Sequence, residues 1–82
     1  MDFALVTVRV ESMHFQVDME MPAKMRIKEL VPKLLEVLKN YDESRFSDVS
    51  SLNLSCNNTR LNEDASLADY QIWDGSILDI TM

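Results

Sequence analysis

The side chains that could take part in chemistry are few and lie far apart in the sequence. His14 is the only histidine and Cys56 the only cysteine. A nucleophilic cysteine needs a nearby base or positive charge, and no histidine or lysine is close to Cys56 in the sequence. We therefore expect a buried, inert thiol. His14 falls on the polar side of an alternating segment, where we expect an exposed structural residue rather than a metal ligand or a base.

Acidic side chains are numerous, but they do not form a metal-binding or catalytic pattern. The chain has 14 Asp and Glu against 8 Lys and Arg, a net charge of −6. Asp42, Glu43 and Asp48 lack the spacing of a calcium loop, and we interpret them as the solvated face of a loop. The single glycine excludes a glycine-rich phosphate loop. We predict no catalytic residue, no metal, no cofactor and no enzymatic activity.

The negative charge is concentrated in the second half of the chain. Residues 42–82 carry two basic and eight acidic side chains, which accounts for the whole excess. Such a surface repels phosphate backbones and anionic lipids, so we expect no direct binding to nucleic acid. No apolar run approaches the length of a membrane span, so we expect no membrane insertion. Most of these acids are expected to solvate the surface; the alternative is that they face a basic partner.

Trp73 is the residue best suited to contact a partner. Tyr70 and Ile72 stand at core-like spacing, which turns Trp73 toward the surface, beside the tight turn at Asp74 and Gly75. An exposed tryptophan is a good anchor at a protein interface. We therefore name Trp73 and Asp74 as candidate partner-binding residues. The alternative is an indole that lies flat over its own domain.

One amphipathic helix, predicted at about residues 28–40, positions the rest of the chain. Apolar residues recur along it at steps of three and four, at Ile27, Leu30, Leu34 and Leu38. This spacing is typical of a helix with one buried stripe. Pro32 would cost a hydrogen bond in a helix interior, so we take it as a marker of the helix start. Asn40 is expected to end the helix, because asparagine tolerates the left-handed conformation.

Short strands occupy most of the remaining sequence. In the first strand, valines alternate with polar residues, while Phe3 and Leu5 fall on the side opposite the valines. We therefore expect the start of this strand to be covered on both faces. Residues 41–50 are predicted to form a polar loop with Tyr41 and Phe46 tucked against the domain. Strands are expected at 3–10, 15–21, 51–56, 60–61 and 76–82, with one helical turn at 66–69.

This order of elements predicts an α+β fold. The first and last strands are the most apolar, so they are expected to pair in parallel at the centre of a mixed sheet of four to five strands. The main helix crosses one face of that sheet, which is the arrangement of a β-grasp. With 82 residues, the chain can hold one small core, and we expect residues 1–82 to form a single domain.

Two segments carry a family resemblance. The stretch from Leu67 to Ile72, followed by Gly75 and an apolar strand, resembles the late segment of ubiquitin-like domains. The helix start Glu29-Leu30-Val31-Pro32-Lys33-Leu34-Leu35 resembles the YukD/EsaB-like ubiquitin-like proteins of type VII (WXG-type, ESX) secretion systems. The N-terminal ubiquitin-like domain of the membrane component EccD is also similar.

The resemblance implies a cytoplasmic, non-enzymatic accessory or regulatory protein of a bacterial type VII secretion system. Such a protein would act by protein–protein docking, with the cytosolic parts of the secretion membrane complex or its ATPase as partners. A homodimer is also compatible with the sequence. Ubiquitin itself presents an apolar patch centred on an isoleucine of its third strand, but the nearest position here is Asn53.

Conjugation is not expected, because no glycine follows Gly75, whereas modifiers end in paired glycines. Three alternatives stay open at this point. The first is a modifier or sulfur carrier with a processed glycine tail. The second is an excised ubiquitin-like domain of an EccD-type membrane component. The third is an adaptor domain of an unrelated pathway.

Overall fold

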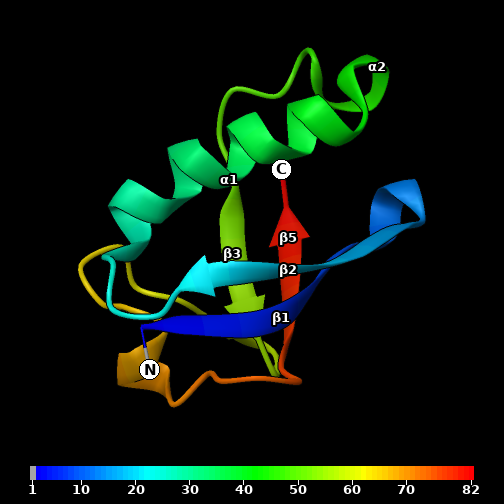
Figure 1. Cartoon of the computed structure of the whole chain (residues 1–82). Coiled ribbons are helices and arrows are strands. Elements are labelled where there is room, and N and C mark those ends of the chain that lie inside the picture. Colours follow the sequence, from blue (N-terminus) through cyan, green and yellow to red (C-terminus); the bar gives the residue numbers. More distant parts are fainter. Residues whose placement is uncertain (1) are drawn as a thin grey trace.

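The computed structural model describes residues 2–82, which form one mixed sheet with a helix across one face (Figure 1). The five strands lie in the order β2-β1-β5-β3-β4. The central strands β1 and β5 are parallel, and all other neighbours are antiparallel. The predicted α+β β-grasp is therefore confirmed. The strands are β1 (Phe3–Val10), β2 (Phe15–Pro22), β3 (Asn53–Cys56), β4 (Thr59–Arg60) and β5 (Ile77–Thr81).

The hairpin of β1 and β2 follows from the alternation of apolar and polar residues. Val6, Val8 and Val10 point toward the helix and are buried, whereas Gln16, Asp18 and Glu20 of β2 are exposed, as an antiparallel pair with one wet face requires. A turn of 3₁₀ helix, η1 (Glu11–Met13), joins the strands. It closes at His14, whose φ of 51° reverses the chain.

Helix α1 (Ile27–Tyr41) extends one residue beyond the predicted range at each end. Backbone carbonyls of a later loop cap its start: Ile27 N–H donates to Ala65 at 2.8 Å and Lys28 N–H to Glu63 at 3.0 Å. Pro32 lies inside the helix, more than one turn after its first residue, so it is not a first-turn proline. Because proline has no N–H, the carbonyl of Lys28 loses its helical donor.

The end of α1 differs from the prediction. Asn40 is an ordinary helical residue, and the helix breaks at Asp42, whose side chain caps a second short helix, α2 (Glu43–Phe46). Phe46 is fully buried, as predicted, but Tyr41 is 55% exposed. The predicted loop therefore contains a helical turn that buries one of the two aromatic residues and leaves the other at the surface.

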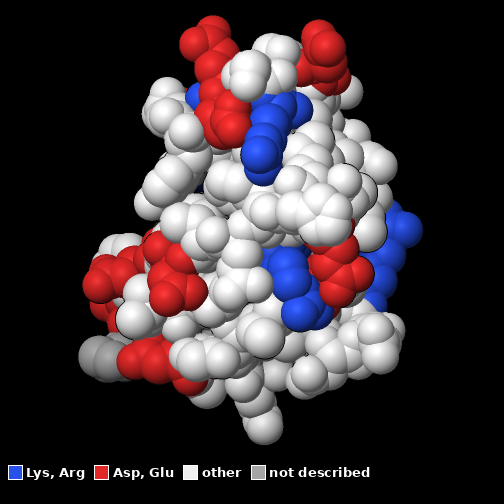
Figure 2. Space-filling model, turned by 90° about the vertical axis from the view of Figure 1, so that its right-hand side faces the viewer, with Lys and Arg blue, Asp and Glu red and all other residues white. Residues whose placement is uncertain are grey.

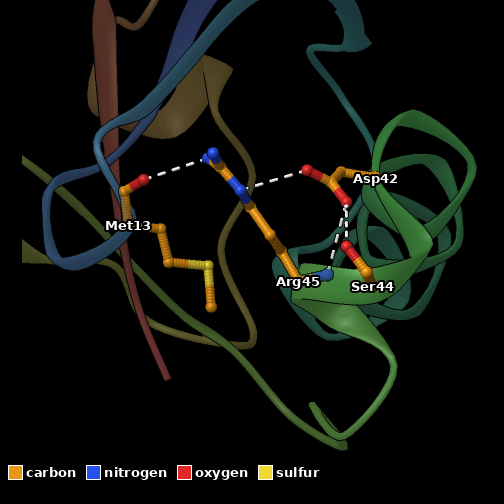
Figure 3. A network of polar contacts seen from close by, with 4 residues as sticks. All are labelled: Met13, Asp42, Ser44 and Arg45. Atoms are coloured by element: carbon orange, nitrogen blue, oxygen red, sulfur yellow. Dashed lines mark hydrogen bonds and ion pairs between the residues drawn. The ribbon is translucent and has the colours of Figure 1, made fainter.

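Arg45 connects α2 to the β1–β2 turn (Figure 3). Its Nη1 donates to the carbonyl oxygen of Met13 at 3.0 Å, and its Nε lies 3.1 Å from Oδ2 of Asp42. The Ser44 hydroxyl donates to the other carboxylate oxygen of Asp42 at 2.8 Å. One guanidinium group therefore links the β1–β2 turn to the start of α2.

The core lies between α1 and the covered face of the sheet. α1 contributes Ile27, Leu30, Leu34, Leu35 and Leu38, and β1 contributes Ala4, Val6, Val8 and Val10, together with Leu54, Leu78 and Ile80 of the other strands. The opposite face carries no second layer within residues 2–82. None of the helices in this range combines the length and apolar character that crossing a membrane requires.

The segment between β4 and β5 folds as its residues predict. Ser66 and Asp69 form a reciprocal capping box at the turn η2 (Ala68–Tyr70), with N–H donors 2.9 and 3.2 Å from the opposing side-chain oxygens. Gly75 has a φ of +90°, which disfavours any residue with a Cβ. Trp73 and Asp74 lie in this segment, shortly before the first residue of β5.

Candidate functional site

The structure keeps the two residues with potential nucleophilic or ligand chemistry apart. His14 is exposed at the β1–β2 turn, and Cys56 ends β3 half-buried rather than fully buried. Burial raises the pKa of the Cys56 thiol, and the negative charge of Asp79 raises it further. The protonated thiol is therefore favoured at neutral pH, which disfavours nucleophilic attack. Within residues 2–82, no three His, Cys, Asp or Glu side chains are grouped as a metal site would need.

Trp73 and Asp74, the candidate partner-binding residues, lie beside the first strand. Asp74 Oδ1 accepts a hydrogen bond from the Leu5 N–H at 2.8 Å, and the Gly75 N–H donates to the Leu5 carbonyl at 2.9 Å. The Asp74 carboxylate thus takes the place of a strand neighbour before β5 begins. Trp73 keeps a large part of its indole exposed. Asp74 has a structural role, and partner binding by either residue stays a prediction.

Four exposed apolar side chains lie on or next to the uncovered face of the sheet, where the sequence predicts a covered strand. The exposed fractions are 53% for Phe3, 48% for Leu5, 43% for Ile77 and 42% for Trp73. The expectation that the start of β1 is covered on both faces is therefore wrong, because no element packs on this side within residues 2–82. We call these four residues the open-face patch.

Strand register explains why residues from distant parts of the chain meet in the open-face patch. Phe3 and Leu5 are two positions apart on β1 and so share a face. Thr7, the next residue on that face, lies opposite Ile77 of β5. Trp73 precedes Asp74, which is bonded to Leu5. The alternation in the sequence places Phe3 and Leu5 on one face, but only the parallel pairing of β1 with β5 adds Ile77.

Acidic residues of β2 border the open-face patch. Glu20 lies opposite Leu5 and Asp18 opposite Thr7 in the β1–β2 register. The Thr7 hydroxyl donates to Asp18 Oδ1 at 2.6 Å. Figure 2 shows one face of the molecule, on which acidic side chains gather in separate groups, some of them next to Lys or Arg, with uncharged surface between the groups. An apolar centre with an acidic border is the pattern of a surface for contact with a protein, since such contacts combine an apolar core with a polar rim.

At the other end of the sheet's open face, the charged side chains form ion pairs with each other. Arg9 Nε lies 2.7 Å from Asp79 Oδ1, and Arg9 Nη2 lies 3.5 Å from Glu11. Arg9 and Asp79 are direct neighbours across the parallel β1–β5 pair. The charges at this end therefore satisfy each other, in contrast to the acids beside the open-face patch.

A groove of about 420 Å³ lies on the other side of the molecule, between the first half of α1 and β3. Val31 and Pro32 line it from the helix, and Leu52 and Arg60 line it from the sheet side. Pro32 therefore has a place on a concave surface, which the sequence alone does not predict.

Comparison with known proteins places the chain in a family. The family described as WXG100 protein secretion system (Wss), protein YukD, matches residues 5–80, nearly the whole chain. Among curated proteins, none matches the chain in sequence.

The solved structures of similar fold include three from type VII (ESX) secretion systems. The ubiquitin-like domain of EccD1, from the type VII secretion system of Mycobacterium tuberculosis, superposes with a TM-score of 0.79 at 21% identity, covering 100% of both chains. The EccD5 ubiquitin-like domain from Mycobacterium xenopi gives 0.77 at 20% identity, covering 99% of this chain and 94% of that one. A chain of the MycP5-free ESX-5 inner membrane complex gives 0.80 at 18% identity, with 99% of this chain matched to 21% of that one. At these identities the likenesses establish the ubiquitin-like fold.

Proposed function

This chain belongs to the YukD family of the WXG100 protein secretion system, and from that premise we propose that it acts by docking to other proteins of the secretion system. It is a ubiquitin-like protein of a type VII secretion system. In our proposal it works in the cytoplasm as a non-enzymatic accessory or regulatory protein. Its partners are the cytosolic parts of the membrane complex or the associated ATPase. The similarity to a chain of the ESX-5 inner membrane complex supports this class of partner.

The observation that carries the docking proposal is the exposed Trp73 beside the uncovered face of the sheet. Tryptophan is enriched among the residues that dominate binding energy at interfaces. Its exposure costs the isolated protein solvation free energy that a partner would recover. The Asp74 carboxylate accepts a hydrogen bond from the Leu5 N–H and so anchors the loop that carries Trp73. Asp74 therefore contributes to docking by positioning this loop.

We further propose that the protein acts without being conjugated to other proteins. Gly75 serves the backbone, since its φ of +90° makes the turn that leads into β5. The intact mass of the protein isolated from its source cells tests this part. A mature form ending in paired glycines, or a ladder of adducts on an immunoblot, would replace docking with a modifier function.

A photo-crosslinking experiment in the source organism tests the docking proposal. A photoreactive amino acid replaces Trp73 in one strain and Val37, an exposed residue of α1, in a matched control strain. We expect crosslinks from position 73 to components of the secretion membrane complex or its ATPase, and none from position 37. Equal crosslinking from both positions, or crosslinks only to proteins outside the secretion system, would refute the proposal.

A second candidate function is supported by one comparison. The ESX-5 chain contains this fold as about one fifth of its length, 21%. If residues 1–82 are likewise a domain of a longer membrane component, docking would occur within that component's own complex. The open reading frame that encodes the chain decides between the two, because membrane-spanning segments after residue 82 would support the second candidate.

A further inference from the structure

We infer that the open-face patch receives a partner segment in which an aliphatic or aromatic side chain is flanked by lysine or arginine. This inference rests on the proposed docking function and specifies the chemistry of the partner at that surface. It is carried by two features of the described residues, the grouping of apolar side chains and the unpaired acids beside them.

The grouping of apolar side chains is built into the sheet. Phe3, Leu5 and Ile77 project from strands that are hydrogen-bonded to each other, so their side chains are held at fixed spacing. Trp73 comes directly before Asp74 and Gly75, which are both hydrogen-bonded to Leu5, so its backbone is anchored close to β1. A rigid apolar surface loses little conformational entropy on binding, which favours its use as a docking site.

The acids beside the patch determine the charge of the partner. Within residues 2–82, neither Asp18 nor Glu20 lies within ion-pair distance of a lysine or arginine. By contrast, Arg9 at the far end of the same face is paired with Asp79 and Glu11. Asp2, near Phe3, has Lys24 at 3.6 Å. Unpaired carboxylates next to an apolar surface attract cationic groups and repel anionic ones, so the complementary segment is basic.

A second copy of the chain fits this surface poorly. A symmetric dimer through the open-face patch would bring Asp18 and Glu20 of the two copies toward each other, and each copy carries a net charge of −6. Stable interfaces also bury about 800 Å² per partner, whereas four half-exposed side chains supply only the centre of such an area. Anionic membranes and nucleic acids are repelled by the same charge.

NMR titration of the purified chain with a defined probe tests the inference. The probe is a short peptide in which leucine and lysine alternate. The matched peptides replace lysine with glutamate or leucine with serine. We expect the leucine–lysine peptide to shift the amide signals of Leu5, Thr7 and Ile77 and the indole N–H of Trp73. The leucine–glutamate peptide should cause no shift, and the serine–lysine peptide should bind roughly ten-fold more weakly.

Paired variants localise the binding. Ile77→Thr should weaken binding roughly ten-fold, as removal of an apolar anchor does, while the control Val37→Thr on α1 should leave it unchanged. Glu20→Gln should weaken it about two- to five-fold at low salt, the usual size of an exposed charge contact, and the control Glu36→Gln should not.

Several outcomes would overturn the inference. These are shifts centred on Asp42 and Glu43 at the start of α2, equal binding of the serine–lysine peptide, or no shift at all. Concentration-dependent shifts at the patch without peptide would assign the surface to a second copy instead. The crosslinking experiment in cells is independent of this titration, so failure of the titration leaves the secretion-system docking proposal standing. Failure of the crosslinking together with normal peptide binding would instead show a surface for basic segments whose partner lies outside the secretion system.

Discussion

The carboxylate of Asp74 accepts a hydrogen bond from the backbone N–H of Leu5 at 2.8 Å, across 69 positions of sequence. The Gly75 N–H returns a hydrogen bond to the Leu5 carbonyl at 2.9 Å. A side chain therefore continues the β1–β5 ladder before the first residue of β5. The same two hydrogen bonds anchor the loop that carries Trp73 to β1. They therefore contribute both to the stability of the fold and to the position of Trp73.

Replacing Asp74 with alanine removes the acceptor for the Leu5 N–H. We expect the free energy of unfolding in urea to fall by about 1 kcal/mol, the usual net value of one hydrogen bond at a partly exposed site. Asp74→Asn keeps an acceptor oxygen and should lose less. Asp48→Ala, which removes an exposed acid without such a bond, controls for the change in net charge. Equal effects of Asp74→Ala and Asp48→Ala would contradict the structural role of Asp74.

The guanidinium of Arg45 is expected to hold the β1–β2 turn against α2 (Figure 3). Arg45→Ala breaks the contacts with Met13 and Asp42 and should lower the free energy of unfolding by about 0.5–1.5 kcal/mol. Arg45→Lys should recover only part, because one ammonium cannot reproduce the planar fork of donors. Amide exchange at His14, whose N–H donates to Glu11, should speed up in both variants. Unchanged exchange would show that the turn is stable without Arg45.

The long strands and the main helix are predictable because each repeats one simple pattern of apolar and polar residues over many positions. The alternation of β1 and β2 and the three- and four-residue steps of α1 each extend over many positions, so local errors cancel. The end of α1 was predicted less well. Asn40 is a reasonable helix terminator in isolation, but Asp42 bonds the Arg45 N–H and starts α2 instead. A helix as short as Glu43–Phe46 has too few residues for a period to show.

The candidate site is only partly predictable from the sequence, because the exposure of an apolar side chain depends on whether another element packs against it. The sequence places Phe3 and Leu5 together on one side of a strand, and two apolar residues there suggested a second covering layer. The structure has none among residues 2–82, so the same residues form a surface patch. Tyr41 illustrates the same limit, since its exposure depends on how Phe46 and Phe15 fill the space nearby.

Pro32 is predicted to lower the stability of α1. Pro32→Ala supplies the N–H donor that the Lys28 carbonyl lacks and removes the clash of the proline ring with that carbonyl, a gain of up to about 3 kcal/mol. The greater freedom of alanine in the unfolded chain offsets about 0.4–1 kcal/mol, so we expect a net gain of about 1–2 kcal/mol in the free energy of unfolding. Lys33→Ala, the neighbouring exposed position, is the control and should change little. A loss of stability in Pro32→Ala would show that packing of the ring in the α1–β3 groove outweighs the helix term.

The reactivity of Cys56 should depend on pH in a way that reports its surroundings. Burial raises the pKa of the Cys56 thiol, and Asp79 raises it further, so the pH midpoint of alkylation by iodoacetamide should lie above that of the unfolded chain. The midpoint is used rather than the rate, because limited access slows the reaction at every pH.

Asp79→Asn removes the smaller of the two causes. It should lower the midpoint of Cys56 alkylation without bringing it down to the value of the unfolded chain, because burial persists. Asp64→Asn, a substitution elsewhere on the surface, should leave the midpoint unchanged. The sign for stability follows: the native state favours the protonated thiol, so the contribution of Cys56 is complete below the unfolded-state thiol pKa and is lost as pH rises through the higher native pKa. A native midpoint equal to that of the unfolded chain would contradict the placement of Cys56 in a partly desolvated site next to Asp79.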